Sequence, residues 1–168
     1  MSDYKIALVT GASAGFGLEI AKVFASNGFK VIAVARRLDK LEELKALFPS
    51  QILPLQLDVT DNAAVEKALD SLPFEFKDID VLINNAGLAL GVDRAQNCDL
   101  NEWNVMVDTN IKGLLNVTYK VLPSMIKRNF GYVINLGSTA GAWPYTGSNV
   151  YGATKAFVEQ FSRNLRCD

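Results

Sequence analysis

The sequence predicts an α/β fold, a doubly wound parallel sheet with helices on both faces. Short continuous apolar runs are typical of strands that are buried on both faces, and such runs recur along the chain. Helix-length segments lie between them, and strands joined in this way pair in parallel through right-handed crossovers. The length of 168 residues, with no linker, repeat or low-complexity tract, predicts one domain over residues 1–168.

Strands and helices are expected to alternate from the first residues to the last. The strands cover residues 6–9, 31–35, 52–57, 81–83 and 132–135. The first helix is predicted to end at Gly28, a left-handed cap. Its apolar face holds Ile20, Ala21, Phe24 and Ala25.

Four more helices follow from apolar spacing and from start and stop signals. The second has Leu41, Leu44 and Leu47 on one face and ends before Pro49. Asp61 is expected to cap the third helix. A long helix is predicted over 101–127, and the last helix begins at Val150 and still continues at the final residue.

Composition and charge exclude several classes of function. Seventeen basic and eighteen acidic residues leave a net charge of −1, so we expect no nucleic-acid or anionic-membrane partner. The chain has no histidine, which excludes a Ser-His-Asp triad and an HExxH zinc helix. Cys98 and Cys167 form no disulfide or metal framework, so no metal site and a reducing, cytoplasmic setting are expected. The apolar run near the N-terminus is shorter than a signal-peptide core or a membrane span, which favours a soluble protein.

A glycine-rich turn joins the first strand to the first helix. Backbone amides and the helix dipole converge on an anion at such a turn, so a dinucleotide pyrophosphate is expected there. The candidate cofactor-binding residues are Thr10, Gly11, Ser13, Gly15, Phe16 and Gly17. The alternative is a tight turn without a ligand. No Gly-Lys-Ser/Thr follows, which disfavours a phosphate loop of the nucleotide-hydrolase kind.

Arg36 and Arg37 follow the second strand, where dinucleotide folds distinguish their two cofactors. A carboxylate here would bind the adenine ribose hydroxyls, whereas two guanidiniums offer forked donors to a 2′-phosphate. The sequence therefore favours NADP(H) over NAD(H). The alternative is a solvated basic pair beside Asp39 and Glu42.

Tyr151, Lys155 and Ser138 are the candidate catalytic residues. Tyr151 and Lys155 are four apart at the start of the last helix and share a face. A phenol ordinarily ionises near pH 10, and an adjacent ammonium favours the phenolate. Ser138 follows the fifth strand, at the carboxyl edge of the sheet where ligands bind. Taken singly, each could be an ordinary aromatic, surface charge or turn hydroxyl.

With these residues in place, the sequence resembles the short-chain dehydrogenase/reductases, which have a dinucleotide-binding Rossmann fold. The resemblance spans the chain and rests on Thr10-Gly11-(x)3-Gly15-x-Gly17, Asp58-Val59, Asn84-Asn85-Ala86-Gly87, Asn110, Ser138 and Tyr151-(x)3-Lys155.

The resemblance implies a role for each of these residues. Tyr151 would be the general acid/base, and Ser138 would hold the substrate oxygen. Lys155 would bind the nicotinamide ribose, and Asn110 would support a proton-relay water. Asp58 and Val59 would contact the adenine, and Asn85 and Ala86 would lie against the cofactor.

Two loop stretches, 84–91 and 137–145, look like those of the NADP-dependent 3-hydroxy acid dehydrogenases, which also handle serine, allo-threonine and malonic semialdehyde. The implied substrate is a small hydroxy acid or carbonyl compound. Alternatively, Leu88, Leu90, Trp143 and Tyr145 are packing residues. A non-catalytic NADP(H)-binding sensor or scaffold is the second functional hypothesis.

The family also sets expectations about length and assembly. Such chains usually run to roughly 250 residues, so the last third is expected to be absent and the fifth strand to have an open edge. A homodimer or homotetramer is implied by resemblance, through the two long C-terminal helices. Val105, Leu115, Phe157 and Phe161 are candidates for that helix packing, or for packing on the chain's own sheet.

Overall fold

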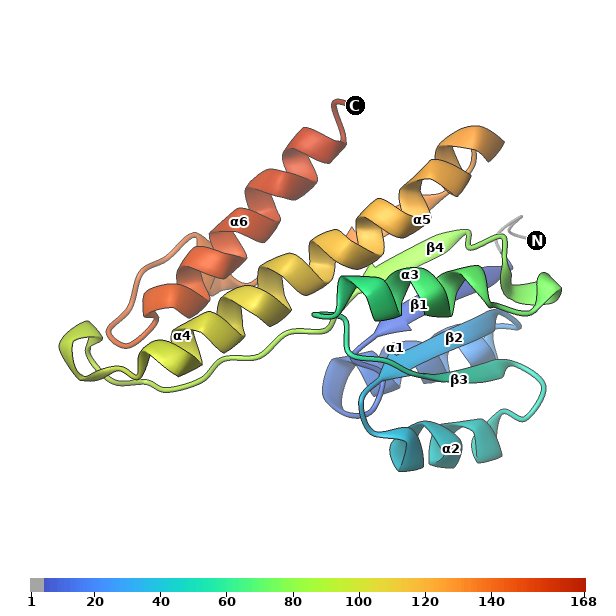
Figure 1. The fold of residues 1–168 in the computed structure, drawn as a ribbon, viewed down its shortest axis with the longest axis horizontal. Coiled ribbons are helices and arrows are strands. Elements are labelled where there is room, and N and C mark those ends of the chain that lie inside the picture. The colour runs from blue at the N-terminus through green and yellow to red at the C-terminus, as the bar shows by residue number, and fades with distance from the viewer. Residues whose placement is uncertain (1–4) are drawn as a thin grey trace.

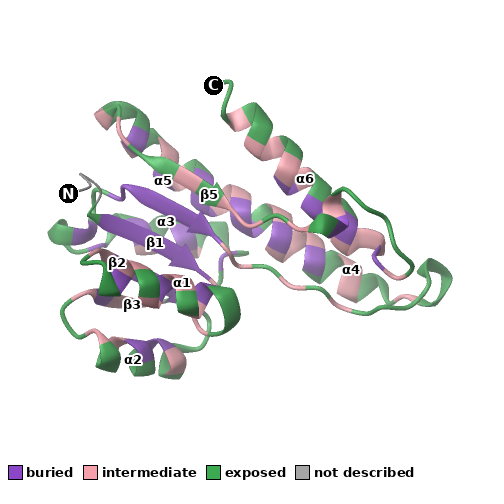
Figure 2. Ribbon diagram, turned by 180° about the vertical axis from the view of Figure 1, so that it is seen from behind, coloured by how far each residue is buried: buried purple, intermediate pink, exposed green. Residues whose placement is uncertain are grey.

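The computed structural model describes residues 5–168 and contains a five-stranded parallel sheet in the order β3-β2-β1-β4-β5. Strands β1, β2, β3 and β4 can be followed in Figure 1, and β5 in Figure 2. The strands are β1 Ile6–Thr10, β2 Lys30–Ala35, β3 Ile52–Gln56, β4 Val81–Asn84 and β5 Tyr132–Asn135. The helices are α1 Gly15–Ser26, α2 Leu38–Leu47, α3 Asn62–Asp70, α4 Leu100–Val107, α5 Leu114–Arg128 and α6 Asn149–Leu165. The predicted doubly wound α/β fold is confirmed. Residues 1–4, which enter the expectation about the N-terminus, lie outside the described residues.

Helices cover both faces of the sheet, which explains why its central strands are apolar throughout. On one face Ala21 of α1 and Leu41 of α2 pack against β1 and β2. On the other face Val65 of α3 and Val121 of α5 pack against the same strands. Consequently β1 is buried along its whole length, whereas β5 is only partly covered (Figure 2). Within residues 5–168, β4 is the strand that pairs with β5.

The expected strand limits agree with the structure to within one residue, whereas the expectations for Leu47 and for the end of the last helix need correction. Gly28 is left-handed at φ +84°, and the Asp61 side chain accepts a hydrogen bond from the Ala64 N–H, as predicted. Leu47 is 63% exposed and does not belong to the buried face of α2, because α2 ends at that residue. The third strand ends one residue early, at Gln56, and α6 ends at Leu165 rather than continuing to the last residue.

The predicted long helix over 101–127 is interrupted. A π-helical segment, Asp108–Gly113, separates α4 from α5. Such a segment makes i→i+5 hydrogen bonds and shifts the helix face by about one residue. Apolar spacing did not reveal it, because the apolar stripes of α4 and α5 are each regular. The segment carries Asn110, which is buried at 2% exposure.

The strand order places a ligand-binding crevice at one end of the sheet. β1 lies between β2 and β4, so the chain passes from β1 to one side and later returns to the other. In open parallel sheets a crevice forms at this reversal, outside the carboxyl ends of the strands. The glycine turn after β1, Arg36 after β2, Asn85 after β4 and Ser138 beyond β5 all lie at that end.

Candidate active site

Side chains of Thr10 and Asn85 tie the ends of β1 and β4 together beneath the crevice. The Thr10 hydroxyl oxygen accepts hydrogen bonds from the backbone N–H groups of Asn85 at 3.0 Å and Ala86 at 2.9 Å. The Asn85 side-chain amide donates to the Thr10 carbonyl at 2.8 Å. Both residues were expected to contact a cofactor, and in this structure these polar atoms hold the protein's own backbone. Their place at the floor of the crevice makes them supports for the turn above.

The glycines of the turn are required by backbone angles and by close packing. Gly11 and Gly15 have φ of +69° and +56°, values that favour glycine. A Cβ on Gly17 would lie 2.3 Å from both the Gly11 carbonyl oxygen and the Asn85 amide nitrogen. The helix α1 therefore starts directly against the turn. Its N-cap residue, Ala14, supplies no side-chain cap, which leaves the first amides of α1 available to an anion.

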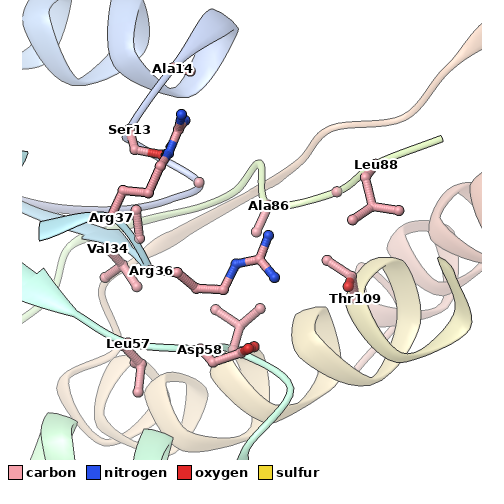
Figure 3. A pocket seen from close by; sticks show the side chains of 14 residues that line it. Ser13, Ala14, Val34, Arg36, Arg37, Leu57, Asp58, Ala86, Leu88 and Thr109 are labelled. Carbon is pink, nitrogen blue, oxygen red and sulfur yellow. Dashed lines mark hydrogen bonds between the residues drawn. The ribbon is translucent and has the colours of Figure 1, made fainter. Parts of the chain in front are cut away.

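A cleft of approximately 250 Å³ opens beside this turn, between the ends of β1, β2 and the segment after β3. Arg36 points into its middle, and Arg37 lies against Ser13 (Figure 3). The Arg37 guanidinium donates to the Ser13 hydroxyl oxygen at 2.9 Å. Across residues 5–168 neither guanidinium has an ion-pair partner, Asp39 and Glu42 included. Two guanidiniums that form no ion pair among the described residues and line the same cleft are suited to binding an anion.

Asp58 and Val59 form the wall of this cleft opposite the glycine turn. The Asp58 carboxylate accepts hydrogen bonds from the Thr60 N–H at 3.0 Å and the Thr60 hydroxyl at 2.8 Å, which fixes its loop. Val59 is buried, and its carbonyl accepts from the Asn116 side chain at 2.9 Å. Thr109 also lines the cleft, from the π-helical segment. In the sequence, nothing distinguishes Thr109 except its place beside Asn110.

A second cleft continues from the first toward α6. The two share Gly87 and Leu88 in their walls, and the second also reaches Phe16, Asn85, Tyr151 and Lys155. Phe16 is 81% exposed at its rim. The arginines after β2 and the Tyr151–Lys155 pair thus lie along one groove at the carboxyl end of the sheet.

Lys155 is buried next to Tyr151. Its ammonium donates to the Leu136 carbonyl at 2.8 Å and lies 5.9 Å from the centre of the Tyr151 ring. Burial lowers the pKa of Lys155 below its usual value. Among the described residues no carboxylate is within ion-pair distance of it. The predicted proximity of the two side chains on one face of α6 is present in the structure.

Ser138 lies just before a short 3-10 turn and is not among the residues that line either cleft. Its hydroxyl oxygen accepts a hydrogen bond from the Ala140 N–H at 3.2 Å, and the preceding residue, Gly137, lines the second cleft with Tyr151. The turn, Thr139–Gly141, packs tightly on α6. A Cβ on Gly152, beside Tyr151, would lie 2.8 Å from the Ala140 carbonyl. The turn that follows Ser138 is thus fixed against α6, and Gly137 is the residue of this loop that lines the second cleft with Tyr151.

Asn110 connects the π-helical segment to two other parts of the site. Its side-chain oxygen accepts from the Leu88 N–H at 2.8 Å, and its amide donates to the Leu88 carbonyl at 2.9 Å and to the Thr154 hydroxyl at 3.0 Å. Thr154, which the sequence did not single out, lies next to Lys155. Asn110 therefore fixes both a groove wall, at Leu88, and the part of α6 next to Lys155.

Two expected pocket residues are largely open to solvent. Trp143 is 74% exposed and Tyr145 is 55% exposed, so in this structure neither packs over the loop. For residues 5–168, no group of three or more metal-binding side chains is found, and no helix is long and apolar enough to cross a membrane.

Comparison with known proteins identifies the family. The family model described as short chain dehydrogenase matches residues 5–168. The chain is 57% identical over 163 residues to the NADP-dependent 3-hydroxy acid dehydrogenase YdfG of Salmonella typhi, covering 97% of this chain and 66% of the relative. It is 50% identical to sulfoacetaldehyde reductase 2 of Chromohalobacter salexigens, covering 100% of this chain and 67% of that protein.

Solved structures agree with this relationship. The serine dehydrogenase of Escherichia coli has a TM-score of 0.95 and 56% identity, over 97% of this chain and 75% of that chain. A closed form of serine dehydrogenase complexed with NADP+ has a TM-score of 0.96, over 97% of this chain and 66% of that one. The chain spans about two thirds of the length of the curated relatives it matches. By its fold, its groove and these matches, the chain belongs to the short-chain dehydrogenase family.

Proposed function

We propose that this protein is an NADP-dependent oxidoreductase acting on a small secondary alcohol or carbonyl compound, most closely a 3-hydroxy acid. The observation that carries the proposal is the continuous groove with Arg36 and Arg37 at one end and Tyr151 and Lys155 at the other. Residues 1–168 would act as a single dinucleotide-binding unit.

The residues along the groove fit NADP(H). Arg36 and Arg37 have no carboxylate partner in the described chain and would hold a 2′-phosphate. The uncapped start of α1 would face the pyrophosphate. Asp58 and Val59 would border the adenine, and Lys155 would donate to the nicotinamide ribose.

Proton transfer would belong to Tyr151. When bound, the nicotinamide would supply or accept a hydride. Tyr151 would exchange the proton at the substrate oxygen, Ser138 would hold that oxygen by a hydrogen bond, and the Lys155 ammonium would stabilise the phenolate. Asn110 would keep α6 and the Leu88 segment in register while this occurs.

The substrate class and the assembly are proposed from the relatives and from one surface. The relatives' names specify a 3-hydroxy acid and sulfoacetaldehyde, both small molecules with an acidic group. Between α5 and α6 lies an apolar groove lined by Leu115, Tyr119, Leu122, Phe161 and Leu165. A second copy of the chain would cover this groove, giving a homodimer or homotetramer.

Substitution Tyr151→Phe tests the assignment of chemistry. We expect NADPH affinity to stay within about twofold while kcat falls by at least about 100-fold, because the phenol proton is lost and the ring is kept. Stopped-flow turnover and fluorescence titration measure the two quantities. Tyr132→Phe, on the exposed face of β5, is the matched control. An unchanged kcat in Tyr151→Phe would reject Tyr151 as the acid/base.

NADPH binding without turnover in the unaltered protein would favour the sensor hypothesis.

A further inference from the structure

A chain of polar side chains crosses the interior from α5 to α6 behind the groove. The Asn84 amide at the end of β4 donates to the Thr118 hydroxyl at 2.9 Å and to the Asn135 side-chain oxygen at 2.8 Å. The Asn135 amide, at the end of β5, then donates to the Ser162 hydroxyl at 2.9 Å. Asn84 and Asn135 face each other in the β4–β5 register. Four elements are thus joined by three side-chain hydrogen bonds.

The direction of these hydrogen bonds is fixed by their ends. The Thr118 hydroxyl donates to the Leu114 carbonyl, and the Ser162 hydroxyl donates to the Val158 carbonyl, both at 2.7 Å. Because each hydroxyl donates its single proton to a helix carbonyl, it accepts a hydrogen bond from the neighbouring asparagine. Asn84 therefore has to supply both of its amide protons. Its side-chain oxygen is buried and has no partner in the described structure.

An interior built for stability alone would avoid that arrangement, because a buried polar atom without a partner destabilises the fold. Apolar side chains could fill the same space between β4, β5 and the two helices. Sites where a sequence departs from the most stable choice are often functional. The reason for this departure lies in the elements that these hydrogen bonds hold together.

The chain of hydrogen bonds ends on α6, the helix that also carries Lys155. Ser162 and Lys155 are seven residues apart on α6, two helical turns, so they lie on the same side about 10 Å apart along the axis. Ser162 is bound to Asn135, and Lys155 is bound to the carbonyl of the next residue, Leu136. The Leu136 N–H in turn donates to the Asn84 carbonyl at 3.0 Å. α6 is thereby fastened at two points, to Asn135 at the end of β5 and to Leu136 just after it, and Asn84 is hydrogen-bonded to both of these residues.

We propose that Asn84, Asn135 and Ser162 are positioning residues, which hold α6 on β5 so that Tyr151 and Lys155 keep their place over the groove. This inference rests on the proposed function of Tyr151 and Lys155. None of the three needs to touch substrate or cofactor. They act through the placement of α6.

Ser162→Ala is the first test, since it removes one half-buried hydroxyl and keeps the helix. We expect kcat to fall about tenfold while the KM for NADP+ changes less than twofold, because small displacements of reacting groups act on turnover. Ser162→Thr keeps the hydroxyl and should restore kcat to within about threefold. Asn164→Ala changes an exposed amide on the same helix, whose side chain contacts only Gln160 among the described residues, and should leave kcat unchanged.

A second readout requires no turnover, so the inference and the proposed function can fail separately. The pKa of the Lys155 ammonium, followed by NMR of Nζ, is lowered by burial in the unaltered protein. Around Nζ lie the Leu136 carbonyl and the Tyr151 ring, and no described carboxylate is within 4 Å. If α6 loosens from β5 in Ser162→Ala, water reaches Nζ and this pKa rises. Asn164→Ala should not move it.

The donor and acceptor roles in this chain of hydrogen bonds give a third test, which compares two aspartate variants. In Asn135→Asp the carboxylate still accepts from Asn84, and the Ser162 hydroxyl can rotate to donate to it. In Asn84→Asp the Thr118 hydroxyl can rotate in the same way, but the carboxylate also faces the Asn135 side-chain oxygen, an acceptor, so this hydrogen bond is lost and the loss of kcat should exceed that in Asn135→Asp by about tenfold. The proposal is overturned by a kcat in Ser162→Ala within twofold of the unaltered protein, by an unmoved Lys155 pKa, or by equal losses in the two aspartate variants.

Discussion

The ammonium of Lys155 occupies a buried position in which a backbone carbonyl is its hydrogen-bond acceptor. Burial disfavours the charged form, and the pKa is lowered from the ordinary 10.5. A buried lysine of this kind destabilises the fold as long as its side chain is charged. In the proposed function this charge would stabilise the neighbouring phenolate, and perturbed pKa values tend to gather at functional sites.

Lys155→Met should change how stability depends on pH. Between the lowered folded-state pKa and 10.5, the unfolded state binds more protons than the folded state, so Lys155 makes the free energy of unfolding rise with pH. Below that window the residue is charged in both states, and above it neutral in both. The free energy of unfolding of the unaltered protein, minus that of Lys155→Met, should therefore increase through the alkaline window. Denaturant unfolding at a series of pH values measures it, and parallel curves would contradict it.

At the scale of single residues, the sequence predicted which side chains share a groove better than it predicted their hydrogen bonds. Spacing and charge singled out Tyr151, Lys155, Arg36 and Arg37, and the structure places all four along one groove. Asn85 was expected to lie against a cofactor, and its side-chain amide holds the Thr10 carbonyl, a contact that the sequence did not reveal. Hydrogen-bond partners of a short polar side chain depend on which elements meet around it, which spacing does not encode.

At the scale of elements, the π-helical segment Asp108–Gly113 is the main departure from the predicted pattern. A regular helix over 101–127 would carry Asn110 at a different angle. The segment instead presents Asn110 to Leu88 and Thr154, and Thr109 to the cofactor cleft. The other strands and helices could be predicted because each has an uninterrupted apolar face and recognisable ends. Periodicity averages over several turns, so one inserted residue between two regular helices escapes it.

Gly113→Ala tests how closely this segment is packed. Its Cβ would lie 2.6 Å from a Val59 methyl group, so the free energy of unfolding should fall by about 1–3 kcal/mol and NADP+ should bind less tightly. Removing those methyls in the double variant Gly113→Ala, Val59→Ala should recover at least about 1 kcal/mol relative to the sum of the single variants. Gly137→Ala is the control for stability, since a Cβ there meets no atom within 4 Å. Additive effects of the two substitutions would contradict this packing.

At the scale of the whole molecule, the sheet places all predicted site residues at one end. This could be predicted, because parallel strands direct their carboxyl ends the same way and the glycine turn follows the first of them. The apolar groove between α5 and α6 could not be located from the sequence. Leu115 and Phe161 were named as possible helix-packing residues, but the same pattern fits packing on the chain's own sheet.

Leu122→Glu tests whether a second copy covers that groove. Leu122 lines it, and a buried carboxylate at a subunit contact should shift the protein toward monomer in analytical ultracentrifugation. Ile126→Glu, one turn further along α5 and outside the groove lining, is 67% exposed and should leave the mass unchanged. Equal masses for Leu122→Glu and the unaltered protein would place the assembly surface elsewhere.

The most direct measurement is the rate at which the purified protein reduces NADP+, and separately NAD+, with 3-hydroxy acids including serine and 3-hydroxypropionate. Nicotinamide absorbance reports the rate. We expect turnover with NADP+, and a kcat/KM lower by at least about tenfold with NAD+, because the hydrogen bonds of Arg36 and Arg37 to a 2′-phosphate are then lost. NADPH binding with no turnover on any member of the panel would contradict the proposed 3-hydroxy acid chemistry, and equal use of the two cofactors would contradict the role of the arginines.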